Sequence, residues 1–102
     1  MTDEETKELR SQIERLLTLN AENRRTETEQ EAVLVTLRQE GDNLKLQTEL
    51  AACGIVSLET LAEITQAYAA RRVEAYQLLA RLERGRAEAK ALQIIVNRKL
   101  DS

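Results

Sequence analysis

Hydrophobic residues recur every three or four positions along two long stretches of the chain, and a short turn signal separates these stretches. This spacing is typical of helices that pack along a heptad seam. The first stretch sets its frame at Leu9, Ile13 and Leu16, becomes polar on every face over 20–31, and resumes the frame at Leu34. The pattern therefore predicts one long helix with apolar sections on either side of a polar middle.

The second stretch repeats this alternation, so the two stretches match when the chain folds back on itself. Its apolar positions end at Leu82 and give way to the charge-rich stretch 83–90 before apolar residues return. Folding back places Leu16 opposite Val96 and sets apolar sections against apolar sections. In the same alignment most facing charges have opposite signs, which favours this register independently. The sequence thus predicts an antiparallel pair of helices.

The segment between the stretches carries a helix stop followed directly by a helix start. Gly54 suits the left-handed position that ends a helix, and Ile55 can then pack back on Leu50, as in a Schellman motif. Ser57 is a suitable N-cap for the next helix, and Val56 before it supplies one half of a hydrophobic staple. These residues predict a closed turn.

We therefore predict an all-α fold, a long antiparallel helical hairpin (coiled coil) that forms a single domain over 1–102. The helices are expected over about 3–53 and about 58–99, with the turn at 54–57. The Gly41-Asp42-Asn43 triplet consists of poor helix formers. It leaves open a three-helix alternative in which the first helix breaks at this point.

Both predicted helices carry apolar residues outside a single stripe, so two helices alone leave apolar surface uncovered. Uncovered apolar surface of several hundred Å² usually marks an interface. A homodimer of hairpins forming a four-helix bundle would cover it, since two-fold dimers are the commonest oligomers, and another helical protein could serve equally. The residues expected at this interface are Leu34, Leu37, Leu44, Leu61, Tyr68, Tyr76, Leu79 and Leu82.

The amino-acid composition excludes most kinds of catalytic site. The chain has no histidine, one cysteine and three isolated glycines. Imidazole-based metal sites, catalytic triads and glycine-rich nucleotide loops are therefore excluded. We expect no enzyme activity, no cofactor, no metal and no small-molecule substrate. We interpret Cys53 as a small buried or half-buried residue at a helix end.

Charge and hydropathy limit the partners further. The net charge of −3 argues against nucleic acid, and the arginines over 71–86 are expected to face acidic residues of the first helix. No apolar run approaches the roughly 20 residues of a membrane span, and the first residues lack the pattern of a secretory signal. We therefore expect a soluble, cytoplasmic protein without membrane insertion.

Leu50 and Ser57 are spaced across the turn as in one known family. In this respect the turn resembles the α-helical hairpin of periplasmic adaptor proteins of tripartite efflux pumps, where an arginine, a leucine and a serine meet the outer-membrane channel. Leu46 stands at the arginine position here, and the resemblance covers only the turn and the adjoining heptads, without the lipoyl and barrel domains. It implies an excised hairpin fragment of such an adaptor.

Three functions are compatible with these features. The leading one is a non-enzymatic coiled-coil module for protein–protein interaction, or scaffold, that self-associates or joins other helical subunits in a larger assembly. The second is a helical chaperone or adaptor that holds a client helix along the widened apolar face. The third is a nucleic-acid binder, which the charge balance disfavours. Heptad repeats indicate how helices pack, but they do not identify the assembly in which a protein acts.

Overall fold

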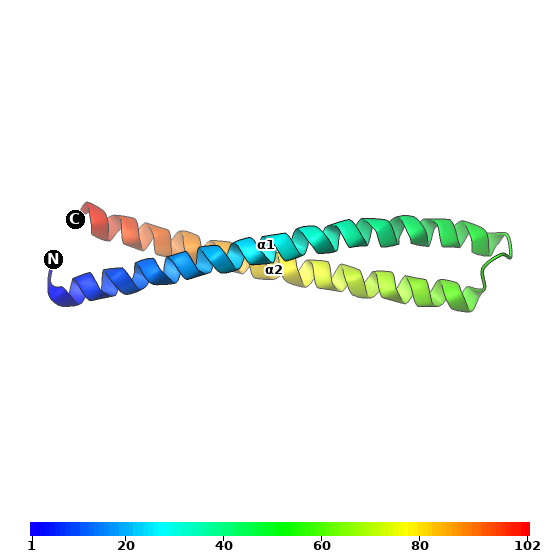
Figure 1. The fold of residues 1–102 in the computed structure, drawn as a ribbon, viewed down its shortest axis with the longest axis horizontal. Helices are drawn as coiled ribbons and strands as arrows, with labels where there is room; N and C mark the ends of the chain where they lie inside the picture. The colour runs from blue at the N-terminus through cyan, green and yellow to red at the C-terminus, as the bar shows by residue number, and fades with distance from the viewer. The chain divides into compact units, whose positions relative to one another are not determined.

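The computed structural model describes all 102 residues and contains two α-helices and no strand. α1 spans Asp3–Ala52 and α2 spans Leu58–Asp101. The helices pack against each other in antiparallel orientation (Figure 1), which confirms the predicted all-α helical hairpin. α1 ends one residue earlier than the predicted boundary at 53, and α2 continues beyond the predicted end at 99.

α1 continues through the Gly41-Asp42-Asn43 triplet without a break, so the three-helix alternative is not adopted. Leu37 and Leu44 lie on the same face on either side of the triplet, and both are half-buried against α2. A Cβ placed on Gly41 would lie 3.3 Å from a ring carbon of Tyr68, so an aromatic side chain packs beside the glycine. Tertiary packing here offsets the low intrinsic helix propensity of the triplet.

The end of α1 has the predicted Schellman geometry. The amide of Gly54 donates to the carbonyl oxygen of Ala51 at 3.0 Å, and the amide of Ile55 donates to that of Leu50 at 2.9 Å. Gly54 has a φ of 77°, which a side chain would make unfavourable. Ile55 remains 70% exposed, so the expected packing on Leu50 does not bury the Ile55 side chain.

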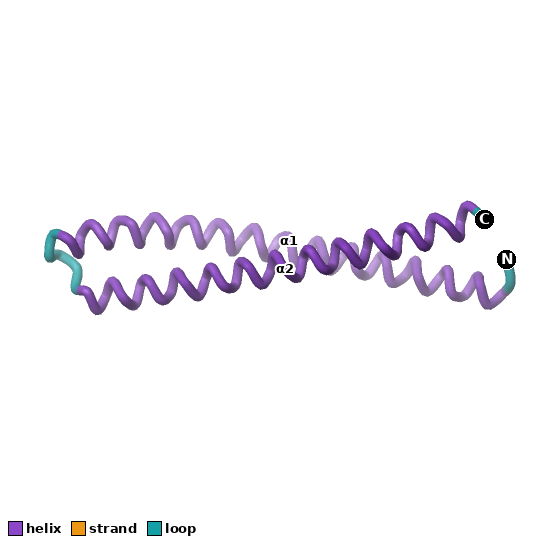
Figure 2. The backbone as a smooth tube through the Cα atoms, turned by 180° about the vertical axis from the view of Figure 1, so that it is seen from behind, coloured by secondary structure: helices purple, strands orange, loops and turns teal.

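The start of α2 is capped as predicted, directly after the turn (Figure 2). The Ser57 hydroxyl oxygen accepts a hydrogen bond from the amide of Thr60 at 3.1 Å, and the hydroxyl donates to the Thr60 hydroxyl at 2.9 Å. Val56 and Leu61 are both half-buried, whereas the residues between them are exposed. The N-cap satisfies one of the amides that the first turn of a helix leaves free.

The chain divides into two compact units, and each helix contributes to both. The first, which we call the terminal unit, consists of Met1–Glu27 and Ala80–Ser102. The second, the turn unit, consists of Thr28–Leu79 and contains the connection between the helices. Within the turn unit the two helical segments lie side by side in both views of the backbone (Figures 1 and 2).

In each unit the seam between the helices follows a regular heptad repeat, and we letter its seam positions a and d. All of these positions are buried or half-buried. They are Leu9, Gln12, Leu16, Leu19, Asn23, Thr26, Gln30, Val33, Leu37, Glu40, Leu44, Gln47 and Ala51 on α1, and Leu61, Ile64, Tyr68, Arg71, Ala75, Leu78, Leu82, Gly85, Ala89, Leu92, Val96 and Lys99 on α2.

This seam is rotated on α1 relative to the frame that the sequence predicts. Leu19 is buried in place of Asn20, and Thr26 is buried in place of Glu27, so the predicted frame is wrong at alternate positions. Burying Leu19 removes more apolar surface from water than burying Asn20 would. The Thr26 hydroxyl can be buried because it donates to the carbonyl oxygen of Glu22 at 3.1 Å.

The two units differ in how completely their seams are closed. The terminal unit contains most of the buried side chains, with Leu16, Leu19 and Ala89 forming one cluster against which Leu92 packs. Leu82 in the same unit is only 1% exposed. In the turn unit the buried residues are Ala75 and Leu78 alone, and the other seam positions are half-buried.

Candidate interaction surface

The side chains beside the seam are those that could contact a further helix. In an antiparallel pair the e positions of the two helices meet along one edge and the g positions along the other. In the terminal unit the e positions nearest the turn unit are charged, and there Glu27 Oε2 lies 3.4 Å from Arg86 Nη2 in an ion pair. In the turn unit the equivalent positions hold Leu34, one heptad after Glu27, and Leu79, one heptad before Arg86. At the level of these two leucines the e edge of the turn unit is therefore apolar.

Leu34 and Leu79 line a groove on this edge. Two hollows of 170 Å³ and 510 Å³ share Leu34 and Leu37, and we call their combined surface the Leu34 groove. Its lining residues are Gln30, Leu34, Leu37, Arg38, Gly41 and Asp42 from α1, and Tyr68, Arg72, Ala75, Tyr76 and Leu79 from α2.

Three large apolar side chains of the Leu34 groove remain in contact with water. Leu34 is 44% exposed, Leu79 is 37% exposed and Tyr76 is 63% exposed. Covering apolar surface contributes roughly 25 cal/mol per Å² to association. The phenol of Tyr76 can stay at a wet rim while its ring is covered, an arrangement common at interfaces. These side chains favour a contact with another apolar surface.

Unpaired charges flank the groove. Arg38 and Arg72 lie at its rim on different helices, and Glu31 is exposed one heptad before Arg38 on the same face of α1. None of these three side chains takes part in an ion pair within the chain. They remain available for charges on a partner.

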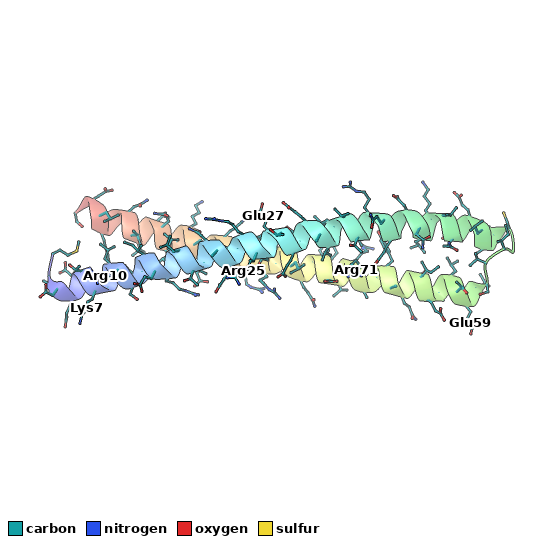
Figure 3. The ribbon with its side chains drawn as sticks, viewed as in Figure 1. Lys7, Arg10, Arg25, Glu27, Glu59 and Arg71 are labelled. Carbon is teal, nitrogen blue, oxygen red and sulfur yellow. The ribbon has the colours of Figure 1, made fainter.

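Arg71, next to Arg72, is by contrast fully engaged at the seam. It reaches from α2 toward α1 (Figure 3), where its Nε and Nη2 donate to Glu40 Oε1 at 3.3 Å and 3.2 Å. Its Nη1 donates to Glu74 Oε2 at 2.8 Å. The hydrogen bond to Glu40, followed by that to Glu74, raises the pKa of Arg71. The Oε2 of Glu40 is buried without a hydrogen-bond partner, so this polar seam is incompletely satisfied.

The eight residues predicted at an interface lie in three different environments. Leu37, Leu44, Leu61 and Tyr68 are half-buried at the seam of the turn unit, whereas Leu82 is covered within the terminal unit. Leu34, Tyr76 and Leu79 are the exposed members, and all three line the Leu34 groove. Their role in binding a partner stays a prediction.

Sequence reasoning overlooked several residues of the Leu34 groove. Gln30, Gly41, Arg72 and Ala75 line it, although none of them is large and apolar. Only their positions in the heptad could have identified them, because each lies at an a or e position. An interface search restricted to leucine and tyrosine passes over such positions.

Cys53 is exposed, so the expectation of a buried or half-buried thiol is wrong. The residue follows the last turn of α1, where the chain leaves the helix and no element covers it. Two arginines of the basic stretch of α2 behave as expected, since Arg71 and Arg86 both pair with glutamates of α1.

The terminal unit carries a smaller and more polar hollow of 230 Å³ on its g edge. Arg15 in its wall forms an ion pair of 3.0 Å with Glu88, and Glu22 lies in the same wall. Three arginines and two glutamates line this hollow, so its charges are nearly balanced. Unlike the Leu34 groove, it is lined by no large exposed apolar side chain.

No group of three or more histidine, cysteine, aspartate or glutamate side chains is placed to hold a metal ion. Neither helix has a stretch both long and apolar enough to cross a membrane. The fold is an all-α helical hairpin, and an apolar groove lies beside the seam of its turn unit. Comparison with family models, curated proteins and solved structures finds no match to the chain.

Proposed function

We propose that this protein is a non-enzymatic helical interaction module, which binds a helical partner along the Leu34 groove and thereby holds subunits of a larger assembly together. The observation that carries the proposal is the change at the e positions. Glu27 and Arg86 close the edge of one unit with an ion pair, whereas Leu34 and Leu79 leave the equivalent edge of the other apolar and exposed.

The form of the groove supports a helix as the bound element. Most of its apolar lining residues come from a and e positions of two antiparallel helices, which create the kind of channel that receives an amphipathic helix. Arg38 and Arg72 at the rim would select charges on the partner, since rim charges act mainly on specificity and association rate.

We further propose a reducing compartment inside the cell as the place of action. Support comes from Cys53, which is the only cysteine and is exposed at the end of α1. An exposed free thiol is compatible with compartments in which glutathione and thioredoxin keep thiols reduced.

Site-specific photocrosslinking would test the interaction surface without assuming who the partner is. A photoreactive p-benzoylphenylalanine replaces Leu34 in the groove or, as a matched control, Leu46, which is 50% exposed and lies outside the groove. We expect a discrete adduct after irradiation in the native cells from position 34 and none from position 46. Equal crosslinking at both positions, or none at either, would reject the groove as a binding surface.

A further inference from the structure

We propose that the helical element bound in the Leu34 groove is a second copy of this chain, related to the first by a two-fold axis perpendicular to the helices at Leu34, with the two turns at opposite ends. The inference rests on the proposed function and names its partner. The charges that flank the groove and the apolar side chains between them fit a second copy of the same surface.

Glu31 and Arg38 make the groove self-complementary. They lie on the same face of α1 on either side of Leu34, both are exposed, and neither has a partner within the chain. A two-fold axis at Leu34 runs the two α1 helices in opposite directions. Arg38 of each copy then lies over Glu31 of the other, so one symmetric contact forms the same ion pair twice.

The alternative orientation, with both turns at the same end, places like charges together. Arg38 and Arg72 lie at one level of the turn unit, since the neighbouring Glu40 and Arg71 are joined across the seam at 3.2 Å. A two-fold axis parallel to the helices sets α1 against α2 of the second copy. Arg38 would then meet Arg72 twice, and such like-charge contacts oppose binding.

The same two-fold arrangement covers the exposed apolar side chains. Leu34 of each copy meets its own equivalent at the axis. Tyr76 lies within one helical turn of the level of the axis on α2, so the second copy covers its ring near the centre of the contact. The side chains that are 44%, 63% and 37% exposed in the single chain thus become the centre of the contact. A central apolar cluster with charges at its rim is the usual anatomy of an interface.

Cys53 provides a reporter of this geometry in the unaltered chain, because it is the only cysteine and is exposed. Helical rise from Leu34 to Cys53 places the two thiols about 55 Å apart in the proposed dimer. With both turns at the same end, stacked hairpins would bring them within about 20 Å of each other. Spin labels on Cys53, read by pulsed electron paramagnetic resonance, separate these two arrangements.

Charge reversal tests the pairing itself. Glu31→Arg and Arg38→Glu should each weaken self-association about tenfold, because each replaces two attractive contacts by two repulsive ones. Mixed together, the two variants should form a heterodimer as tight as the original, since the arginine introduced at position 31 of one copy then meets the glutamate introduced at position 38 of the other. The double variant Glu31→Arg/Arg38→Glu should also recover. Glu63→Arg, an exposed reversal on α2 outside the groove, is the matched control and should leave the affinity unchanged.

The measurements are sedimentation equilibrium for mass, with circular dichroism to verify that each variant is helical. A dimer of about 23 kDa, twice the 11.6 kDa chain, with labels about 55 Å apart and rescue on mixing supports the inference. A monomer, labels within about 20 Å, or failure of the mixed variants to associate would overturn it. If the protein is a monomer and position 34 still crosslinks to another protein, the proposed dimer is wrong but the proposed interaction module is supported.

Discussion

The terminal unit and the turn unit use the same heptad pattern of packing but achieve different degrees of closure. In the terminal unit most seam positions hold leucine, alanine or valine, Leu82 is almost completely covered, and an ion pair between Glu27 and Arg86 lies over the edge. In the turn unit the seam contains the long polar side chains of Glu40 and Arg71, and its edge is apolar. The first unit buries the leucines of its seam, although Leu17, Ile94 and Ile95 outside the seam stay exposed, and the second leaves Leu34 and Leu79 beside its seam accessible.

The cause of this difference lies in the side chains at the seam. Small and branched apolar residues let two helices approach closely, whereas a charged pair at d positions must remain partly hydrated. The side chains of Arg71 and Glu40 are accordingly 35% and 30% exposed. The charged pair therefore holds the two helices in register while keeping this part of the seam partly open, which leaves room for a third surface.

The largest effect that distinguishes the units is expected from truncation of their seams. Leu82→Ala should lower the free energy of unfolding by about 3 kcal/mol, because it leaves a cavity in a covered site. Leu37→Ala in the half-buried seam of the turn unit should cost only about 1 kcal/mol. Urea denaturation followed by circular dichroism measures both. Leu58→Ala, at a side chain that is 78% exposed, serves as the control. Equal losses at positions 82 and 37 would contradict the difference between the units.

Alanine substitutions at two glycines, at and beside the seam, test how tightly the helices pack in each unit. Gly85→Ala should destabilise the terminal unit by about 1 kcal/mol, because overpacking outweighs the gain in helix propensity. An added Cβ at this position would lie 3.0 Å from Asn23 Cγ and collide with its Oδ1. Gly41→Ala should be close to neutral, since only the Tyr68 ring at 3.3 Å must move slightly. Thermal denaturation of the two variants checks this, and a more stable Gly85→Ala protein would show that the terminal unit is loosely packed.

Removing Arg71 should weaken the turn unit by a smaller amount. Arg71→Met leaves the carboxylate of Glu40 without its partner, so the melting temperature should fall, and Glu40→Leu in the same chain should restore part of it.

The effect of Arg71 on stability should not depend on pH in the neutral range. Because its hydrogen bonds to Glu40 and Glu74 raise the pKa of Arg71, the stabilisation is complete below the ordinary arginine pKa. It is lost only as pH rises through the higher folded value. Melting curves from about pH 6 to about pH 10, a range below any arginine titration, should therefore show the same effect of Arg71→Met throughout. Additive single and double variants would indicate that the two side chains are not coupled.

The smallest effects are expected from exposed ion pairs of the terminal unit. Glu88→Gln removes the negative charge that pairs with Arg15, whose side chain is 51% exposed, and should change the free energy of unfolding by less than about 1 kcal/mol. Added sodium chloride should reduce even this difference through screening. Urea titrations at low and high salt provide the measurement. A loss comparable to that of Leu82→Ala would mean that charge, rather than apolar packing, holds this unit together.

The sequence was most informative where the determinants of structure are local. The glycine at 54 and the serine at 57 report a helix stop and a helix start through capping chemistry that involves only near neighbours, and both were placed correctly. The hairpin followed from these caps and from the long heptad stretches. Such signals are readable because a single side chain suffices to satisfy a single backbone group.

The rotation of the seam was not predictable from the same pattern. Val33 and Leu34 are adjacent and both apolar, so either could serve as the inward position, and the choice depends on what the opposite helix offers. Glu40 and Arg71 occupy seam positions that a hydrophobic pattern assigns to the surface. The Leu34 groove depends on both features, which explains why its exposed leucines and tyrosine were anticipated but its glutamine, glycine and arginine were not.

The contact between Asn23 and Gly85 has a consequence for how this sequence can change over time. The asparagine occupies the space that a side chain at 85 would need, so a larger residue at one position requires a smaller one at the other. Sliding the helices by one heptad would instead set Asn23 against Leu78 or Leu92 and bury its amide beside a leucine. Descendants of this chain should therefore vary at positions 23 and 85 together, and that covariation would preserve the alignment of the two helices.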